Sequence, residues 1–122
     1  MDMTKTRELG AWGEHEAQRY LSQQGVEIIA GNVHTPYGKI DLIGRDEGAL
    51  VFFEVKTRRT KTFGYPEQSI RGKKMEHMIN SAVYYLQSNP EIASDWRIDV
   101  LSVEKPAGKE IKVTWFKYAI SA

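Results

Sequence analysis

The pattern of apolar and polar residues along the chain predicts two helices and five strands. Apolar residues recur at helical spacing over residues 4–24, and Gly25 stands where a glycine commonly ends a helix. A second helical pattern covers residues 70–88, with Ser69 as its cap and Asn89-Pro90 as its stop. Strand-like runs are expected at residues 26–33, 40–43, 49–55, 96–103 and 111–118. The order α-β-β-β-α-β-β indicates an α/β fold class, with a mixed five-stranded sheet flanked by helices.

The second and third of these strands are expected to form a β-hairpin, because the polar connection at residues 45–48 contains residues typical of turns. If the turn centres between the last two residues of this connection, Asp41 lies opposite Glu54 and Lys39 lies opposite Lys56. Glu54 and Lys56 then share a face, which Asp41 joins from the neighbouring strand. Two carboxylates that close in such apolar strands need a compensating cation, and a divalent metal is the simplest candidate.

Glu54-Val55-Lys56 is a weak motif by itself, because a Glu-x-Lys triplet has an even chance of occurring in a chain of this length. A second copy at residues 110–112 begins a strand after a turn and has no aspartate in a partner strand, so we interpret it as a solvated face. The copy at residues 54–56 ends an apolar run, has Asp41 at a hairpin-compatible position and is followed directly by basic residues. Its setting, and not the triplet, indicates a site.

The chemistry that these residues suit is metal-assisted cleavage of a phosphodiester bond. The carboxylates of Asp41 and Glu54, helped by the backbone carbonyl of Val55, are oxygen ligands of the kind that Mg²⁺ or Mn²⁺ prefers. Such an ion polarises the phosphate and generates hydroxide from bound water, while Lys56 would orient that water or balance charge on phosphorus. The competing interpretation is a structural ion pair at a sheet edge, and the residues alone leave both open.

Basic residues are concentrated after the hairpin, although the net charge of the chain is only +1. Residues 56–74 contain seven basic residues against the single acid Glu67, namely Lys56, Arg58, Arg59, Lys61, Arg71, Lys73 and Lys74. Residues 57–69 are expected to be a loop, whose basic and aromatic content suits contact with a nucleic-acid backbone. The alternative is an ordinary solvated loop.

Glu14 flanks the apolar stripe of the first helix and allows two interpretations. It is either a boundary glutamate whose carboxylate reaches water, or it points toward Asp41 and Glu54 from a helix that lies over the hairpin. The other candidate residues are interpreted as surface, boundary, core or structural residues and not as parts of a site. These are the scattered histidines His15, His34 and His77, the core or interface aromatics Trp12, Trp96 and Trp115, and the strand residue Asp99.

Composition sets the outer limits. The 122 residues fit a single domain over residues 1–122, and 41% hydrophobic with 27% charged residues is a globular balance. The absence of cysteine excludes a disulfide framework and a thiolate metal site, and suits a cytoplasmic location. No apolar run approaches the roughly 20 residues of a membrane helix, and the first residues lack a signal-peptide pattern, so we expect no membrane association.

Three motifs together resemble the YraN-type bacterial proteins, an uncharacterised family that is similar to Holliday-junction resolvases of the PD-(D/E)xK nuclease superfamily. The motifs are Trp12-Gly13-Glu14, Gly38-Lys39-Ile40-Asp41-Leu42-Ile43 and Phe53-Glu54-Val55-Lys56-Thr57-Arg58. The resemblance covers residues 10–103 and implies a restriction-endonuclease-like core. It implies Asp41 and Glu54 as metal ligands, Lys56 as the catalytic lysine and Glu14 as the acidic residue of the first helix. The family usually has glutamate where this chain has Lys39, which could add a phosphate contact, lower the pKa of Lys56 or mark lost cleavage.

The resulting hypothesis is a metal-dependent endonuclease-like protein that acts on structured or branched DNA, with Mg²⁺ or Mn²⁺ as cofactor. Glu14 would hold a metal-bound water or orient Lys56. The DNA backbone would be held by Lys39, Arg58, Arg59, Lys61, Lys73 and Lys74. Cutting two strands symmetrically needs two sites, so a homodimer is compatible with this hypothesis. The alternatives are a non-catalytic nucleic-acid-binding protein that retains the nuclease fold and, more weakly, a protein-interaction scaffold.

Overall fold

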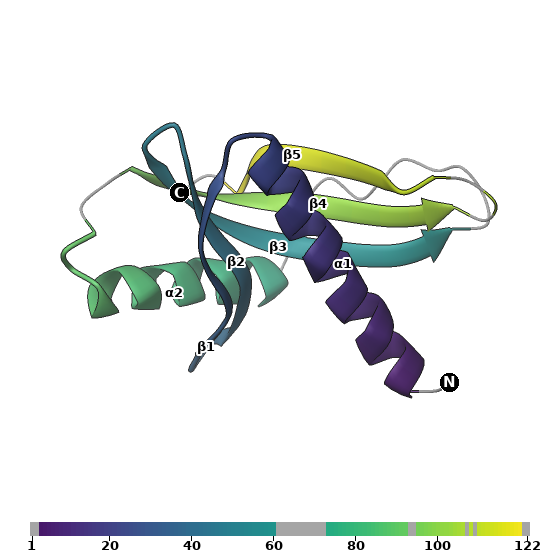
Figure 1. Ribbon diagram of the computed structural model, residues 1–122. Coiled ribbons are helices and arrows are strands. Elements are labelled where there is room, and N and C mark those ends of the chain that lie inside the picture. Colours follow the sequence, from purple (N-terminus) through teal and green to yellow (C-terminus); the bar gives the residue numbers. More distant parts are fainter. Residues whose placement is uncertain (1–2, 61–72, 93–94, 107, 109, 121–122) are drawn as a thin grey trace.

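One helix packs on each face of a twisted sheet in the computed structural model (Figure 1). The structure describes residues 3–60, 73–92, 95–106, 108 and 110–120. Within these residues the elements are α1 (Met3–Gln23), β1 (Glu27–Thr35), β2 (Gly38–Asp46), β3 (Ala49–Thr60), α2 (Lys73–Ser88), β4 (Trp96–Pro106) and β5 (Lys112–Ile120). The predicted element order and the α/β class with a mixed sheet are therefore confirmed.

Strand β3 is longer than the sequence pattern suggests. From Leu50 onward it pairs in parallel with β4, and the last pair joins Thr60 to Pro106. Pairing with a neighbouring strand satisfies the backbone of this polar segment, so the predicted loop is wrong over residues 57–60. The remainder of that loop, including Lys61, and residues 69–72 at the predicted start of the second helix lie outside the described residues.

The described strands follow the order β1-β2-β3-β4-β5, and β3–β4 is the parallel pair among them. Helix α2 supplies the crossover that a parallel pair requires. The β2–β3 hairpin turns through Glu47 and Gly48, whose φ angles of 50° and 88° are the positive values that a two-residue type I′ turn demands. Ladder pairs from Asp46–Ala49 to Leu42–Phe53 confirm the predicted register over this part of the hairpin.

The C-terminal end of α1 is fixed by a Schellman motif. Gly25 adopts φ 90° and donates its N–H to the carbonyl of Ser22 at 3.2 Å, while the N–H of Val26 donates to the carbonyl of Leu21 at 3.0 Å. Val26 and Leu21 are both buried in the same apolar cluster. This ending sets the direction in which α1 enters the sheet.

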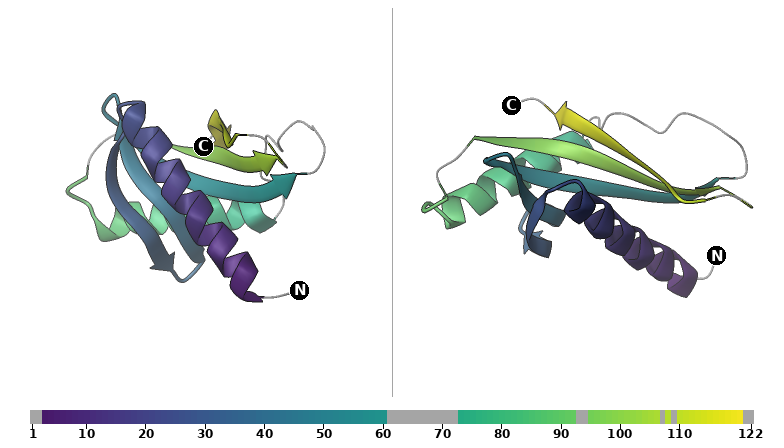
Figure 2. Two further views of the ribbon diagram at one scale, coloured as in Figure 1. Left: turned by 45° about the vertical axis from the view of Figure 1, so that its right-hand side comes forward. Right: turned by 45° about the horizontal axis from the view of Figure 1, so that its top comes forward.

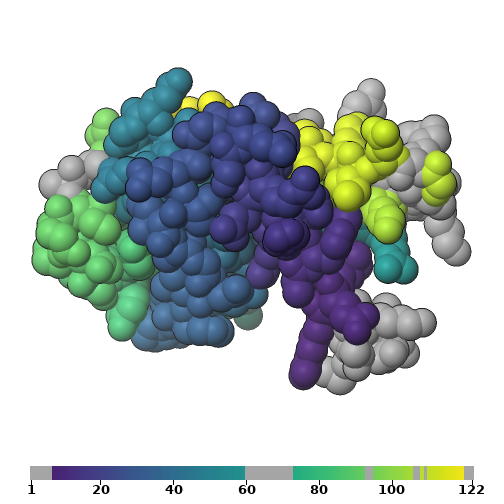
Figure 3. All heavy atoms as spheres, viewed as in Figure 1, coloured from purple at the N-terminus to yellow at the C-terminus, as the bar shows by residue number. Residues whose placement is uncertain are grey.

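Alternating side chains of the central strands divide the core into two layers. On one face Phe53 and its neighbours pack with Ala17 and Leu21 of α1, and on the other face Phe52 and its neighbours pack with Met78 and Ala82 of α2. Figure 2 shows the two helices on opposite sides of the sheet. In the space-filling view, α1 (purple) lies beside β1 and β2 (blue) on the side of the molecule that faces the viewer (Figure 3). Neither described helix is long and apolar enough to cross a membrane.

Candidate metal and nucleic-acid site

Strands β2 and β3 separate at Asp41, and this fork forms the candidate site. Their ladder ends at Leu42–Phe53, beyond which the described part of β2 pairs with β1 and that of β3 pairs with β4. Lys39 therefore pairs with His34 of β1, and the expected ladder opposition of Lys39 to Lys56 is wrong. Asp41 and Glu54 flank the fork as the first residues past the ladder.

The Asp41 side chain provides the physical reason for the fork. In a continued ladder the next hydrogen-bonded pair would join Ile40 to Val55. Instead, the Val55 N–H donates to Asp41 Oδ2 at 2.8 Å, so a carboxylate takes the place of a backbone carbonyl. Strand β2 also twists here, as the burial of two of its side chains shows. Ile40 is buried in the core layer beneath α2, whereas Leu42, two residues later, is buried in the core layer beneath α1.

The two carboxylates at the fork are shielded from solvent and repel one another. Asp41 is 7% exposed and Glu54 is 6% exposed. Burial and the negative charge of Glu54 raise the pKa of Asp41 to about 6, although the Val55 N–H and the charge of Lys39 act in the opposite direction. Two negative charges at this place are therefore unfavourable without additional positive charge.

Two lysines supply part of that positive charge. Lys39 Nζ lies 3.0 Å from Glu14 Oε1 and 3.4 Å from Asp41 Oδ1, and Lys74 Nζ lies 2.8 Å from Glu54 Oε1. The hydrogen bond to Glu54 raises the pKa of Lys74. Burial alone would lower the pKa of Lys39, but the hydrogen bond to Glu14 and the charges of Asp41 and Glu14 raise it overall. Both amines are therefore charged at neutral pH.

Glu14 reaches the hairpin because α1 approaches β3 closely at Gly13. A Cβ atom at Gly13 would lie 1.9 Å from Oγ1 of Thr57, so only glycine fits this contact. Thr57 directly follows Lys56 in β3. The Gly13–Thr57 contact thus places Glu14 near the fork, where its connection to Asp41 runs through the amine of Lys39.

The basic residues that follow Glu54 within the described part of β3 are divided between the two faces of the sheet, because β3 continues as a strand through them. Alternation places Lys56 and Arg58 on the face of Glu54 and Arg59 on the opposite face. Arg58 Nε lies 3.2 Å from Glu104 Oε1, its parallel neighbour on β4. Lys73 is exposed at the first described turn of α2. Arg58 and Arg59 therefore lie on opposite faces of the sheet.

A small hollow brings further residues of α2 to the fork. Its volume is about 90 Å³, and its lining consists of Tyr37, Gly38, Lys39, Glu54, Lys74, His77, Met78 and Ser81. Ser81 Oγ accepts a hydrogen bond from Thr35 Oγ1 at 3.0 Å, and this contact joins α2 to the β1–β2 turn. His77, which the sequence predicted to be a surface or boundary residue, is exposed, and it also lines this hollow together with Glu54 and Lys74. The signal that could have found it is its spacing from Lys74 and Ser81, three and four residues along one helix face.

The donor atoms at the fork fit a magnesium-type ion better than a transition-metal cage. Within the described residues, no three side chains of histidine, aspartate or glutamate come together as a metal-binding group. The carboxylates of Asp41 and Glu54 flank the fork, and the backbone carbonyl of Val55 stays a predicted third ligand. Oxygen donors in this small number suit Mg²⁺ or Mn²⁺, since Mg²⁺ retains several of its waters.

A second carboxylate cluster, at the other end of β2, has a different character. Asp99 is fully buried and accepts hydrogen bonds from Arg97 Nε at 3.1 Å, Trp115 Nε1 at 2.9 Å and the Tyr118 N–H at 2.8 Å. Arg97 also donates to Asp46 at 2.7 Å, and its own side chain is only 8% exposed. This closed network joins β2, β4 and β5, in keeping with the structural interpretation of Asp99.

The fold and the fork define an α/β protein whose mixed sheet carries a pair of buried carboxylates where two strands diverge. The chain belongs to the uncharacterised protein family UPF0102, whose model matches residues 13–103, a segment that contains Glu14, Asp41, Glu54 and Lys56.

Its similarity to individual UPF0102 proteins extends over most of the chain. It is 41% identical over 103 residues to one from Syntrophomonas wolfei, which covers 84% of this chain and 90% of the relative. It is 38% identical over 117 residues to one from Marinobacter nauticus, with 96% and 95% covered. It is 37% identical over 108 residues to one from Syntrophotalea carbinolica, with 88% and 87% covered.

Proposed function

We propose that this protein is a metal-dependent endonuclease-like protein that acts on structured or branched DNA, with Mg²⁺ or Mn²⁺ held at the fork. The observation that carries the proposal is the pair of buried carboxylates, Asp41 and Glu54, whose counter-ions are lysines that remain open to solvent. The side chains of Lys39 and Lys74 are 40% and 59% exposed. A metal ion can therefore replace these amines without unpacking the core.

The Asp46–Arg97 pair provides the contrast within the same chain. There the arginine is buried with its carboxylates and donates to two of them. Separation of either partner would leave an uncompensated buried charge, which is strongly destabilising. At the fork, by contrast, the acids are buried and the cations are solvent-exposed side chains. This asymmetry is expected of a site that exchanges one cation for another and is not needed for a purely structural ion pair.

Bound at the fork, a divalent ion would polarise a phosphodiester and lower the pKa of a bound water. The protein residues have separate tasks in hydrolysis, in which a water oxygen bonds to phosphorus and the bond from phosphorus to the leaving oxygen breaks. Lys56, on the face of Glu54, would stabilise the negative charge that develops on the phosphate. Lys39 and Lys74, once displaced from the carboxylates, would be available to the neighbouring phosphates.

The choice of branched DNA follows from the resemblance to Holliday-junction resolvases. Symmetric cleavage of a junction requires two sites, so a homodimer is part of this proposal. The exposed Lys73 would extend the cationic surface on the α2 face. Arg58 lies on the same face, where it forms an ion pair with Glu104. Arg59 lies on the opposite face of the sheet.

The test is incubation of the purified protein with single-stranded, duplex, flap and four-way DNA in the presence of Mg²⁺ or Mn²⁺. Metal-dependent products are expected from the branched substrates and should be absent with Asp41→Asn, with Glu54→Gln or with a chelator. Glu110→Gln is the matched control, since it alters the other Glu-x-Lys triplet, and it should cleave like the wild type. Failure to cut any of these substrates would reject the enzymatic function for them.

The second candidate, a non-catalytic nucleic-acid-binding protein, is favoured by one observation. Lys39 links Glu14 to Asp41 at the position where the resembling family usually has glutamate, so the acidic residues are already partly neutralised. Salt-dependent binding that survives Asp41→Ala and Glu54→Ala, without any metal-dependent product, would support this alternative.

A further inference from the structure

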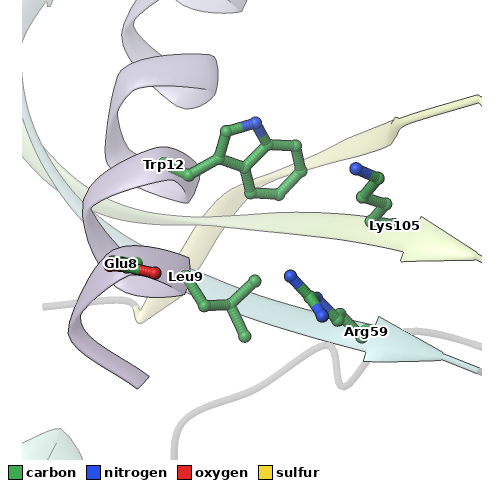
Figure 4. Close-up of a pocket in the computed structure, with 5 residues that line it drawn as sticks. All are labelled: Glu8, Leu9, Trp12, Arg59 and Lys105. Carbon is green, nitrogen blue, oxygen red and sulfur yellow. The ribbon is translucent and has the colours of Figure 1, made fainter. Parts of the chain in front are cut away.

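A second pocket lies on the α1 face, at the end of the sheet where β3 and β4 finish. It has a volume of about 310 Å³ and is lined by Glu8, Leu9 and Trp12 of α1, Arg59 of β3 and Lys105 of β4. Figure 4 shows the indole of Trp12 and the side chains of Arg59 and Lys105 extending into the space between the helix and the two strands. The hollow at the fork, about 90 Å³, is much smaller.

The cations of this pocket lack acidic partners among the described residues. Arg59 and Lys105 are direct neighbours in the parallel ladder, and both are exposed. Like charges at such positions destabilise a sheet, and one residue earlier the same two strands pair Arg58 with Glu104 instead. Glu8 lines the pocket, but no ion pair within the described residues joins it to either cation. The unfavourable pair therefore points to an anion that binds between them.

Trp12 adds an aromatic surface to the two cations. Its ring is partly buried against the α1 layer of the core, and Lys105 Nζ lies 5.8 Å from the ring centroid. The chain contains a second lysine–tryptophan pair, Lys117 over Trp115 at 4.4 Å, but there the amine also has a carboxylate partner, Asp46, at 3.4 Å. An aromatic face beside unmatched cations is suited to a ligand that is both aromatic and anionic.

We propose that this pocket binds a nucleoside phosphate, with its base stacked on Trp12 and its phosphate held by Arg59 and Lys105. Stacking on aromatic side chains and neutralisation of phosphates by basic ones are the two elements of single-strand binding. A volume of about 310 Å³ lies at the lower end of the range of small-molecule sites. Since only an unpaired base can enter, the ligand is either a nucleotide of a single-stranded segment or a free mononucleotide.

This inference goes beyond the proposed function, because it requires neither a metal nor cleavage. Alternation along β3 places Arg59 of the pocket and Glu54 of the fork on opposite faces of the sheet. A strand bound in the pocket would therefore pass around the end of β3 and β4 to reach the fork. The pocket would thus favour DNA with an unpaired segment beside its duplex part.

The test measures binding of a fluorescent short oligothymidylate, its duplex form and thymidine monophosphate to the intact chain, without metal. Trp12→Leu and the double variant Arg59→Ala/Lys105→Ala should each weaken binding of the single strand roughly tenfold, while Trp12→Phe should retain most of it. Lys117→Ala is the matched control and should bind like the wild type.

The two ligands distinguish the source of the nucleoside phosphate. A single strand that binds more tightly than the monophosphate, with both sensitive to the same variants, identifies a strand-binding pocket, and equal binding identifies a mononucleotide site. Wild-type affinity for both ligands in Trp12→Leu and in the double variant would overturn the proposal. Because Arg59 and Lys105 are exposed, the double variant keeps the test decisive even if Trp12→Leu does not fold. The assay reads binding alone, so its failure is separate from a failure of the cleavage test.

Discussion

The carboxylate of Asp41 accepts a hydrogen bond from the backbone N–H of Val55 at 2.8 Å, at the point where the ladder between β2 and β3 has ended. This one contact holds the two strands together as they diverge. It also fixes one oxygen of Asp41, while the other faces the amine of Lys39 at 3.4 Å. The fork and the charge of the candidate site therefore depend on the same side chain.

Removal of the negative charge at position 41 should stabilise the metal-free protein. Burial and the neighbouring charge of Glu54 raise the pKa of Asp41 from 3.8 to about 6, so at neutral pH its ionised form is less favourable in the folded state than in the unfolded state. Asp41→Asn keeps an acceptor for Val55 and should raise the free energy of unfolding by on the order of 2 kcal/mol, measured by denaturant unfolding in a chelator.

The same variant distinguishes a metal site from a bare acidic cluster. Added Mg²⁺ or Mn²⁺ should raise the melting temperature of the wild type, because it binds the folded state, and should have little effect on Asp41→Asn. Equal responses of the two proteins to metal would show that Asp41 is not a ligand.

Gly13→Ala should destabilise the protein and weaken the contact of α1 with the sheet. The added methyl group would meet Thr57 at a distance of 1.9 Å, so the helix must shift, at a cost of about 1–3 kcal/mol. Gly10→Ala is the matched control on the same helix, since a Cβ atom there meets nothing within 4 Å. Thermal unfolding should show Gly10→Ala at or above wild-type stability, and equal losses for both variants would contradict the proposed close contact.

Stability in acid should depend on Asp46. The hydrogen bond from Arg97 lowers the pKa of Asp46 below its ordinary value of 3.8. The folded state therefore binds this proton less readily than the unfolded state, so the contribution is complete above that value and is lost as the pH falls through the lowered pKa. Urea unfolding across this range should show the wild type more stable than Asp46→Asn at neutral pH. The difference should shrink below about pH 4, whereas a difference that is constant with pH would exclude the charged pair as its cause.

Lys39→Glu should make the stability of the folded protein depend more strongly on a bound divalent metal ion. The change removes the amine that links Glu14 to Asp41 and adds a third carboxylate beside them. Without metal the added repulsion should lower stability, and with Mg²⁺ or Mn²⁺ the additional oxygen ligands should strengthen binding, as calorimetric titration can measure. Lys39→Met separates the two effects, because it removes the amine without adding a ligand. Unchanged metal affinity in Lys39→Glu would place the ion elsewhere.

The register of the hairpin was predictable because its determinants are local. A glycine-containing turn between two apolar runs fixes which residues pair, and the pairs from Asp46–Ala49 to Leu42–Phe53 follow from it. The fork could not be predicted in this way, since it arises when a side chain replaces a backbone acceptor. Extension of the register to Lys39 and Lys56 assumed an uninterrupted ladder and therefore failed.

The sequence also could not predict which cations pair with the carboxylates at the fork. Lys74 meets Glu54 because α2 docks on the β1–β2 turn through Ser81, a contact between residues far apart in the chain. The faces of Arg58 and Arg59 would have followed from alternation, but the polar composition of residues 57–60 was interpreted as a loop. Parallel pairing with β4, which no local pattern reveals, decides that they form a strand.

The most direct test of the metal site is a crystal structure of the protein soaked in Mn²⁺, with the ion located by its anomalous scattering. We predict a single strong peak roughly 2.1 Å from carboxylate oxygens of Asp41 and Glu54, with the amines of Lys39 and Lys74 displaced from them. An anomalous map without a peak at the fork, with both lysines still on the carboxylates, would contradict the account.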